Sequence, residues 1–141
     1  MKHFYKLFIL LLFPSAVLMA QGYELVWEEN FDGASLNPDV WNVETAIGIW
    51  NTGANQELQH YRAENVSVGP DRLDNNALII TAKRENYNGY QFTSGRINTR
   101  SKVAARYGKI EARIKLPQLA NGFWPAFWML GSNIETAPWP Q

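Results

Sequence analysis

The sequence predicts an all-β domain, an antiparallel sandwich or barrel, and three observations carry this prediction. Apolar and polar residues alternate with a period of two in several short segments, as they do along a strand with one buried face. No window of ten or more residues after residue 22 shows the 3.6-residue apolar stripe of a helix. Gly, Pro and Asn separate the segments at the short intervals that are typical of antiparallel strands.

The clearest alternation spans residues 108–116, where aliphatic side chains point to one face and Lys, Glu and Arg to the other. Residues 77–82 predict a more continuously apolar strand, which follows turn residues at 74–76. A third strand is expected over residues 90–100, after the hairpin-type pair Asn88-Gly89. Shorter strands are expected over residues 24–27, 57–61 and 66–68.

Length and charge limit the classes of function. The 141 residues suffice for one small domain. The 13 Lys and Arg balance the 13 Asp and Glu, which argues against a nucleic-acid partner or a polybasic membrane-surface binder. The supply of aromatic residues, including 6 Trp, excludes a disordered chain.

The first 20 residues predict a secretory signal peptide. Lys2 and Lys6 precede the apolar run 7–13, which Pro14 follows, and Ala20 provides a small residue for cleavage. The run is too short for a transmembrane helix, so no membrane span is expected after its removal. The sequence therefore predicts an exported protein, secreted or held in the periplasm or at the cell surface, whose domain occupies residues 21–141.

Several catalytic chemistries are excluded by composition. The only histidines are His3 and His60, and His3 lies in the signal segment, so a His-based triad or a His-rich metal site is not expected. The chain has no Cys, which excludes disulfides and thiolate chemistry.

The tryptophans near the C-terminus predict a binding surface. Trp124 and Trp128 are four residues apart, so in a strand their indoles would lie on one face of the sheet. Two indoles on a concave face match the C–H face of a pyranose ring, and their N–H groups can reach sugar hydroxyls. Plain core packing is the alternative.

Five segments, in this order, carry a resemblance to a known family: Leu-Val-Trp-Glu-Glu-Asn-Phe-Asp-Gly at 25–33, Asn-Gln-Glu-Leu-Gln-His-Tyr at 55–61, Thr-Ser-Gly-Arg-Ile-Asn-Thr at 93–99, Tyr-Gly-Lys-Ile-Glu-Ala-Arg at 107–113 and Trp-Pro-Ala-Phe-Trp-Met-Leu-Gly at 124–131. The sequence resembles glycoside hydrolase family 16, in particular its laminarinase-like endo-β-1,3-glucanase branch. The resemblance implies a concanavalin A-like jelly roll, an antiparallel β-sandwich whose concave face is an open cleft for a polysaccharide. It also implies retaining, double-displacement hydrolysis of internal β-1,3 or β-1,3/1,4 linkages.

The catalytic signature of that family, Glu-x-Asp-x-x-Glu, does not occur in these 141 residues. By resemblance it is expected just after Gln141, so the chain is expected to be an incomplete jelly roll without catalytic residues of its own. A retaining pair needs two carboxyls about 5–5.5 Å apart. The alternating Glu28 and Glu29 and the lone Glu111 and Glu135 offer no such pair.

The resemblance also implies substrate-binding residues. Trp124 and Trp128 match cleft tryptophans, Arg96 matches an arginine that faces the negative-numbered subsites, and Asn55 matches a cleft asparagine. For Arg96 the alternative is a surface salt bridge, and for Asn55 it is a loop cap. Glu57, next to that asparagine, is expected to make a structural hydrogen bond.

The implied partner is a β-glucan, no cofactor is required, and a monomer is expected for the complete domain. Family members often hold a structural Ca²⁺ on the convex side, but Asn30 stands where a Glu is usual, which weakens the case for the ion here. A second class of function stays open: a non-catalytic carbohydrate-binding sandwich that keeps Trp124 and Trp128. A structural cell-surface module would leave both tryptophans without a role.

Overall fold

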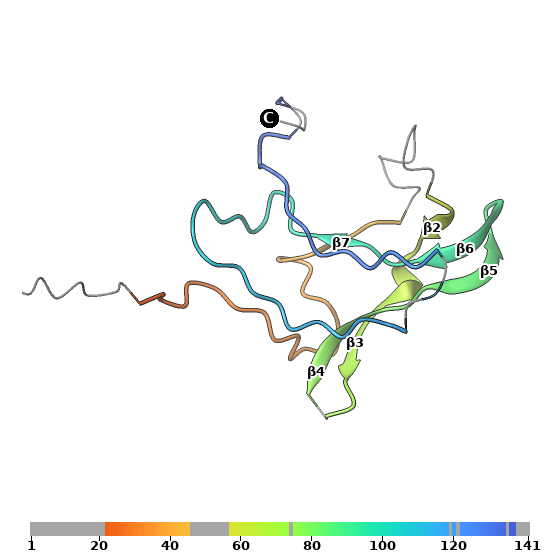
Figure 1. Ribbon diagram of the computed structural model, residues 1–141, viewed down its shortest axis with the longest axis horizontal. Coiled ribbons are helices and arrows are strands. Elements are labelled where there is room, and N and C mark those ends of the chain that lie inside the picture. Colours follow the sequence, from red (N-terminus) through yellow and green to blue (C-terminus); the bar gives the residue numbers. More distant parts are fainter. Residues whose placement is uncertain are drawn as a thin grey trace, which may run out of the picture.

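A computed structural model describes residues 22–45, 57–73, 75–118, 120, 122–134 and 136–137 (Figure 1). The predicted signal peptide and Asn55 lie outside these described residues. Within them, seven strands and one 3₁₀ turn form: β1 (Asn42–Val43), β2 (Gln59–Tyr61), η1 (Ala63–Asn65), β3 (Val66–Pro70), β4 (Asn76–Ile80), β5 (Lys83–Tyr87), β6 (Tyr90–Ser94) and β7 (Ile97–Asn98). The all-β prediction is confirmed. No helix in this part of the chain is long and apolar enough to cross a membrane.

The strands β3 and β4 form an antiparallel hairpin whose register runs from Val66↔Ile80 to Pro70↔Asn76. Asp71 closes its turn, because its Oδ1 accepts the Leu73 amide at 2.7 Å and the Asn75 amide at 3.0 Å. The first of these bonds is the main reason that the pKa of Asp71 lies below its ordinary value. Local turn chemistry, which the sequence displays, thus sets this hairpin.

The second sheet has the strand order β2-β6-β5. Its β5–β6 hairpin turns at Asn88-Gly89, where both residues have positive φ, 48° and 84°, as the sequence predicts for this dipeptide. The strand β2 pairs with β6 in parallel, with Tyr61 opposite Ser94, which is the one departure from the antiparallel pattern among the described strands.

The expected strand over residues 90–100 is two strands. β6 ends at Ser94, and β7 leaves that sheet to pair with β1 in antiparallel register, Val43↔Ile97. The break falls at Gly95, where an added Cβ would lie 2.6 Å from a methyl of Val66 and 3.0 Å from the Asn65 carbonyl oxygen. Only glycine permits this close approach of the chain to the β3–β4 hairpin.

The strands expected over residues 24–27 and 108–116 form no ladder among the described residues, and neither does the segment 122–131, for which a strand was one possibility. The Lys109 ammonium lies 5.9 Å from the ring of Tyr23, just before the first of these segments, but neither segment forms a ladder with a described strand. Sequence alternation reports which way side chains point, whereas a strand is defined by its hydrogen-bonded neighbour. β5 was not expected, because three of its five residues are charged (Lys83, Arg84 and Glu85).

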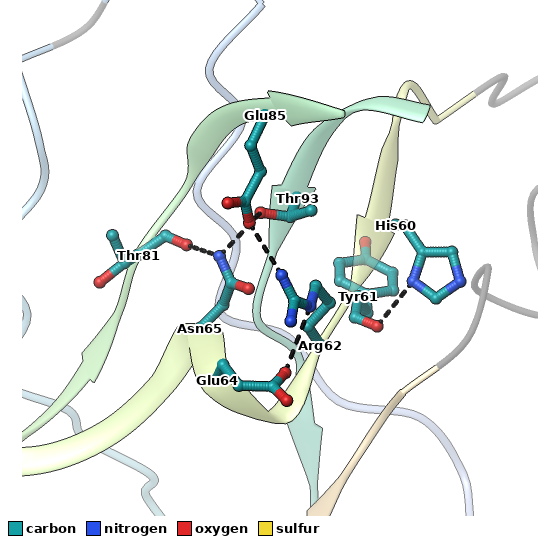
Figure 2. Close-up of polar contacts among 8 residues, drawn as sticks. All are labelled: His60, Tyr61, Arg62, Glu64, Asn65, Thr81, Glu85 and Thr93. Atoms are coloured by element: carbon teal, nitrogen blue, oxygen red, sulfur yellow. Dashed lines mark hydrogen bonds and ion pairs between the residues drawn. The ribbon is translucent and has the colours of Figure 1, made fainter. Parts of the chain in front are cut away.

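Polar side chains occupy the interior where β2, η1, β5 and β6 meet (Figure 2). Asn65 is 1 % exposed and donates from Nδ2 to the Thr81 carbonyl at 2.7 Å and to the Thr93 hydroxyl at 3.1 Å. The Thr93 hydroxyl in turn donates to Glu85 at 2.6 Å, and Arg62 reaches the same carboxylate at 3.2 Å. Among the described residues, Tyr61 is the large apolar side chain that is buried. Hydrogen bonds between polar side chains therefore hold β2, η1, β5 and β6 together here.

Candidate functional site

Arg96 lies in the link between β6 and β7, directly after Gly95. Its carbonyl oxygen accepts the Glu44 amide at 2.9 Å, which extends the β1–β7 pairing by one step. Its side chain is 17 % exposed, so the guanidinium is largely shielded from water. The backbone therefore fixes the position from which the side chain extends.

Four side chains surround the Arg96 guanidinium. Its Nε lies 3.3 Å from Glu44 Oε2, and one terminal nitrogen lies 3.9 Å from Glu57 Oε1. Its central carbon lies 5.4 Å from the centre of the Trp128 ring and 5.7 Å from that of Tyr61, which are cation–π distances. In Figure 1 the blue C-terminal segment, which carries Trp128, runs past β6 and β7. We call Arg96, Glu44, Glu57, Tyr61 and Trp128 the arginine cluster.

Tyr61 holds one carboxylate of the arginine cluster through its hydroxyl group. Its hydroxyl donates to Glu57 Oε2 at 3.0 Å and accepts from Gln59 Nε2 at 2.9 Å. Burial raises the pKa of the Tyr61 phenol above its ordinary value, so the hydroxyl stays a donor at neutral pH. The structural hydrogen bond expected of Glu57 is thus present.

The two tryptophans differ in their surroundings. Trp128 lies against Arg96 and is 52 % exposed, whereas Trp124 is 91 % exposed. The structure brings together two of the sequence-predicted residues, Arg96 and Trp128, and leaves Trp124 at the surface. Residues 122–131 are not a paired strand among the described residues, so the shared face of Trp124 and Trp128 stays a prediction. The sugar-binding role of these residues stays a prediction.

The salt bridge considered as the alternative for Arg96 is present, and it involves a residue that the sequence did not single out. Glu44 binds Arg96 through Oε2, while its Oε1 accepts from Asn98 Nδ2 at 2.9 Å. Glu44 and Asn98 are 54 residues apart in the sequence. No local pattern marks Glu44, because its contacts depend on the pairing of β1 with β7.

The chemistry of the arginine cluster is that of binding. A guanidinium offers several N–H donors to hydroxyl groups, and a half-exposed indole offers an apolar face. Both carboxylates of the cluster are ion-paired with Arg96. Of the other acids, Glu111 pairs with Lys109 at 2.9 Å, and Glu135 lies outside the described residues.

In the segment around Asn30, the carboxylate of Glu29 is engaged in hydrogen bonds within the chain. Glu29 uses both carboxylate oxygens, one for the Phe31 amide at 2.8 Å and one for the Trp41 indole N–H at 2.9 Å. No group of three or more Asp, Glu, His or Cys that could hold a metal occurs among the residues that the structure describes. We derive no role for Ca²⁺.

Comparison with known proteins decides the family. The model of "Glycosyl hydrolases family 16" matches residues 59–139, which is more than half of the chain. The chain belongs to glycosyl hydrolase family 16. The matched region includes the strands β2 to β7 and, within the arginine cluster, Tyr61, Arg96 and Trp128.

Relatives of this family 16 chain support the assignment. A beta-glucanase of Rhodothermus marinus is 40 % identical over 128 residues, which cover 86 % of this chain and 42 % of the relative. A beta-1,3-glucan-binding protein of Penaeus monodon is 46 % identical over 48 residues, 34 % of this chain and 13 % of the relative.

Among solved structures, the laminarinase from Flavobacterium sp. UMI-01 superimposes with a TM-score of 0.70 and 48 % identity, over 83 % of this chain and 47 % of that one. This similarity supports the jelly-roll fold. The chain spans less than half the length of each of these relatives.

Proposed function

We propose that this chain is part of an exported β-glucan endohydrolase that cleaves internal β-1,3 or β-1,3/1,4 linkages with retention of configuration. The observation that carries the proposal is the contact between Arg96 and the half-exposed Trp128, 5.4 Å apart, in a chain of family 16. The names of the relatives, a beta-glucanase, a laminarinase and a β-1,3-glucan-binding protein, all point to the same class of polysaccharide.

The proposed role of this chain is to bind and orient the polysaccharide. The exposed face of Trp128 stacks on one pyranose ring, while Arg96, on the other side of the indole, donates hydrogen bonds to hydroxyls of a neighbouring sugar unit. Asn55 is proposed as a further hydroxyl partner and Trp124 as a second stacking surface. Orientation of this kind places the scissile bond against the reacting groups.

Bond cleavage with retention needs two carboxyls about 5–5.5 Å apart, and the signature that supplies them in the family, Glu-x-Asp-x-x-Glu, does not occur in these 141 residues. In the proposed reaction one carboxylate attacks the anomeric carbon, while the other protonates the leaving oxygen and later activates water. We propose that these groups come from a Glu-x-Asp-x-x-Glu strand elsewhere in the protein, and that residues 1–20 direct its export. No cofactor takes part in this proposal.

The test is an assay of the protein expressed from its full reading frame, beside the 141-residue chain alone. We expect the full protein to release reducing ends from laminarin and the 141-residue chain to release none. NMR of the anomeric proton should show that the product keeps the β configuration. Trp128→Ala in the full protein should weaken binding of a β-1,3-linked glucose oligosaccharide about 5- to 30-fold, from the loss of about 1–2 kcal/mol of stacking. A full protein without hydrolytic activity on any β-glucan would contradict the proposal.

The second candidate is a non-catalytic carbohydrate-binding protein. It is favoured by the 46 % identity over 48 residues to the Penaeus monodon β-1,3-glucan-binding protein. The same assay separates the two: oligosaccharide binding by the full protein without release of reducing ends, from a reading frame that lacks the signature, supports this candidate.

A further inference from the structure

We propose that Glu44 and Glu57 are positioning residues, which hold the Arg96 guanidinium against one face of the Trp128 indole and so leave the other face for a sugar ring. This inference rests on the proposed function, since it assigns the groups that prepare its stacking surface. The role is indirect, because neither carboxylate is proposed to touch the substrate.

The first argument is that both carboxylates are themselves held in place. Glu44 contacts Arg96 at 3.3 Å through one oxygen and accepts from Asn98 at 2.9 Å through the other. Glu57 contacts Arg96 at 3.9 Å and accepts the Tyr61 hydroxyl at 3.0 Å. Each glutamate therefore links the guanidinium to a strand, Glu44 to β7 and Glu57 to β2.

The second argument is that one cation faces two carboxylates. A single carboxylate would suffice for charge balance, and a long Arg side chain with one partner keeps much of its rotamer freedom. Two carboxylates from segments on different sheets restrict both the position and the plane of the guanidinium. Fixing the position of the Arg96 guanidinium, more than neutralising its charge, therefore explains why two carboxylates contact it.

The third argument concerns the indole. Among the described residues, those at 122–131 form no strand ladder, so within this part of the protein side-chain contacts, and not sheet hydrogen bonds, position Trp128. Arg96 is 17 % exposed and lies 5.4 Å from its ring, a cation–π contact in a partly desolvated place. Trp128 is 52 % exposed, which fits a ring with one face against Arg96 and the other open. Moving Arg96 therefore moves or frees the indole.

The experiment uses the protein from its full reading frame, labelled with 5-fluorotryptophan. Each Trp then gives a ¹⁹F resonance, and the Trp128 resonance is assigned with Trp128→Phe. We expect Glu44→Gln and Glu57→Gln to shift or broaden the Trp128 resonance. The matched control is Glu64→Gln, because Glu64 pairs with Arg62 at 3.2 Å away from the arginine cluster and should leave that resonance in place.

Binding and kinetics provide the second readout. We expect each of Glu44→Gln and Glu57→Gln to raise the Kd for a β-1,3-linked glucose oligosaccharide about 2- to 5-fold, the equivalent of one cation–π contact. The loss should appear in KM rather than in kcat, because placement of the indole affects binding and not the reacting atoms. Glu44→Asp, which keeps the charge, should recover part of the affinity.

The outcomes separate this inference from the proposed function. An unmoved Trp128 resonance in both variants, or an unchanged Kd in variants of a protein that binds the oligosaccharide, would overturn the positioning role. If the variants melt at a lower temperature while the Trp128 resonance and the Kd stay the same, the ion pairs of Arg96 have only a structural role and the inference is wrong. A wild-type protein that binds no β-glucan contradicts the proposed function instead, and the ¹⁹F shifts still decide whether the glutamates hold the indole.

Discussion

Replacing Asn65 should be among the most destabilising single changes in the described part of this chain. The Asn65 side chain is 1 % exposed, and its Nδ2 supplies the Thr81 carbonyl and the Thr93 hydroxyl with a hydrogen-bond donor (Figure 2). Alanine at this position removes both donors. Thr81 is exposed, so its carbonyl can turn to solvent water, whereas the Thr93 hydroxyl retains Glu85.

The magnitude follows from the two lost bonds. Loss of an ordinary hydrogen bond costs about 0.5–1.5 kcal/mol, and two are lost here. We therefore expect Asn65→Ala to lower the free energy of unfolding by about 1–3 kcal/mol, a substantial part of the ~5–15 kcal/mol of a typical domain. Thr93→Val should cost about 1–3 kcal/mol, and the double variant less than the sum of the two, because both changes remove the same bond.

The measurement is urea unfolding of the full-reading-frame protein, produced in a bacterial host. Asn86→Ala is the matched control: Asn86 is exposed on β5, so its loss should stay within about 0.5 kcal/mol. Asn65→Asp keeps the shape of the side chain but puts a carboxylate oxygen beside the Thr81 carbonyl oxygen. Two acceptors repel each other unless the new carboxyl carries a proton, so its protonated form is favoured. The stability of this variant should therefore fall as pH rises from about 4 to about 7. Equal midpoints for Asn65→Ala and Asn86→Ala would refute the reasoning.

Three further predictions concern pH, packing and the isolated chain. The hydrogen bond from Thr93, and then the nearby cations Lys83 and Arg62, hold the pKa of Glu85 below its ordinary 4.5. The stabilisation by ionised Glu85 is therefore present above about pH 4.5 and is lost as pH falls through the lower pKa of the folded state. Glu85→Gln should reduce the loss of stability at acid pH, measured by urea unfolding. Gly95→Ala should cost about 1–3 kcal/mol through the 2.6 Å approach to Val66, whereas Gly22→Ala, which meets nothing within 4 Å, should be neutral in the same melts. The 141-residue chain alone should bind the dye ANS and melt without a sharp transition, because many large apolar side chains are exposed among its described residues; a cooperative melt of a monomer would contradict this.

The sequence predicted those parts of the fold that depend on local chemistry. The sequence predicted turn residues at 74–76 and at Asn88-Gly89, and turns lie after β3 and β5; the hydrogen bonds of Asp71 in the first of these turns were not foreseen. The parallel pairing of β2 with β6 was not predictable, because hydrophobic patterning specifies a buried face and not the direction of the neighbouring strand. The break at Gly95 depends on a contact with Val66, which no period of two encodes.

The candidate site shows the same division. Arg96 and Trp128 were found from segments that resemble a family, and the structure places them in contact. Glu44 was missed because its contact with Arg96 exists only after β1 has paired with β7. The common face of Trp124 and Trp128 stays a prediction, because it depends on a strand that forms no ladder among the described residues.

Fold and site meet at Gly95. Since it lacks a Cβ, the chain can pass close to the β3–β4 hairpin and turn from the pairing of β6 with β2 to the pairing of β7 with β1. This turn places the next residue, Arg96, within ion-pair distance of both Glu44 and Glu57. A side chain at position 95 should therefore disturb stability and oligosaccharide binding together. Changes in the network around Asn65 should instead lower stability and leave the affinity of the folded protein unchanged, because that network does not include Arg96 or Trp128.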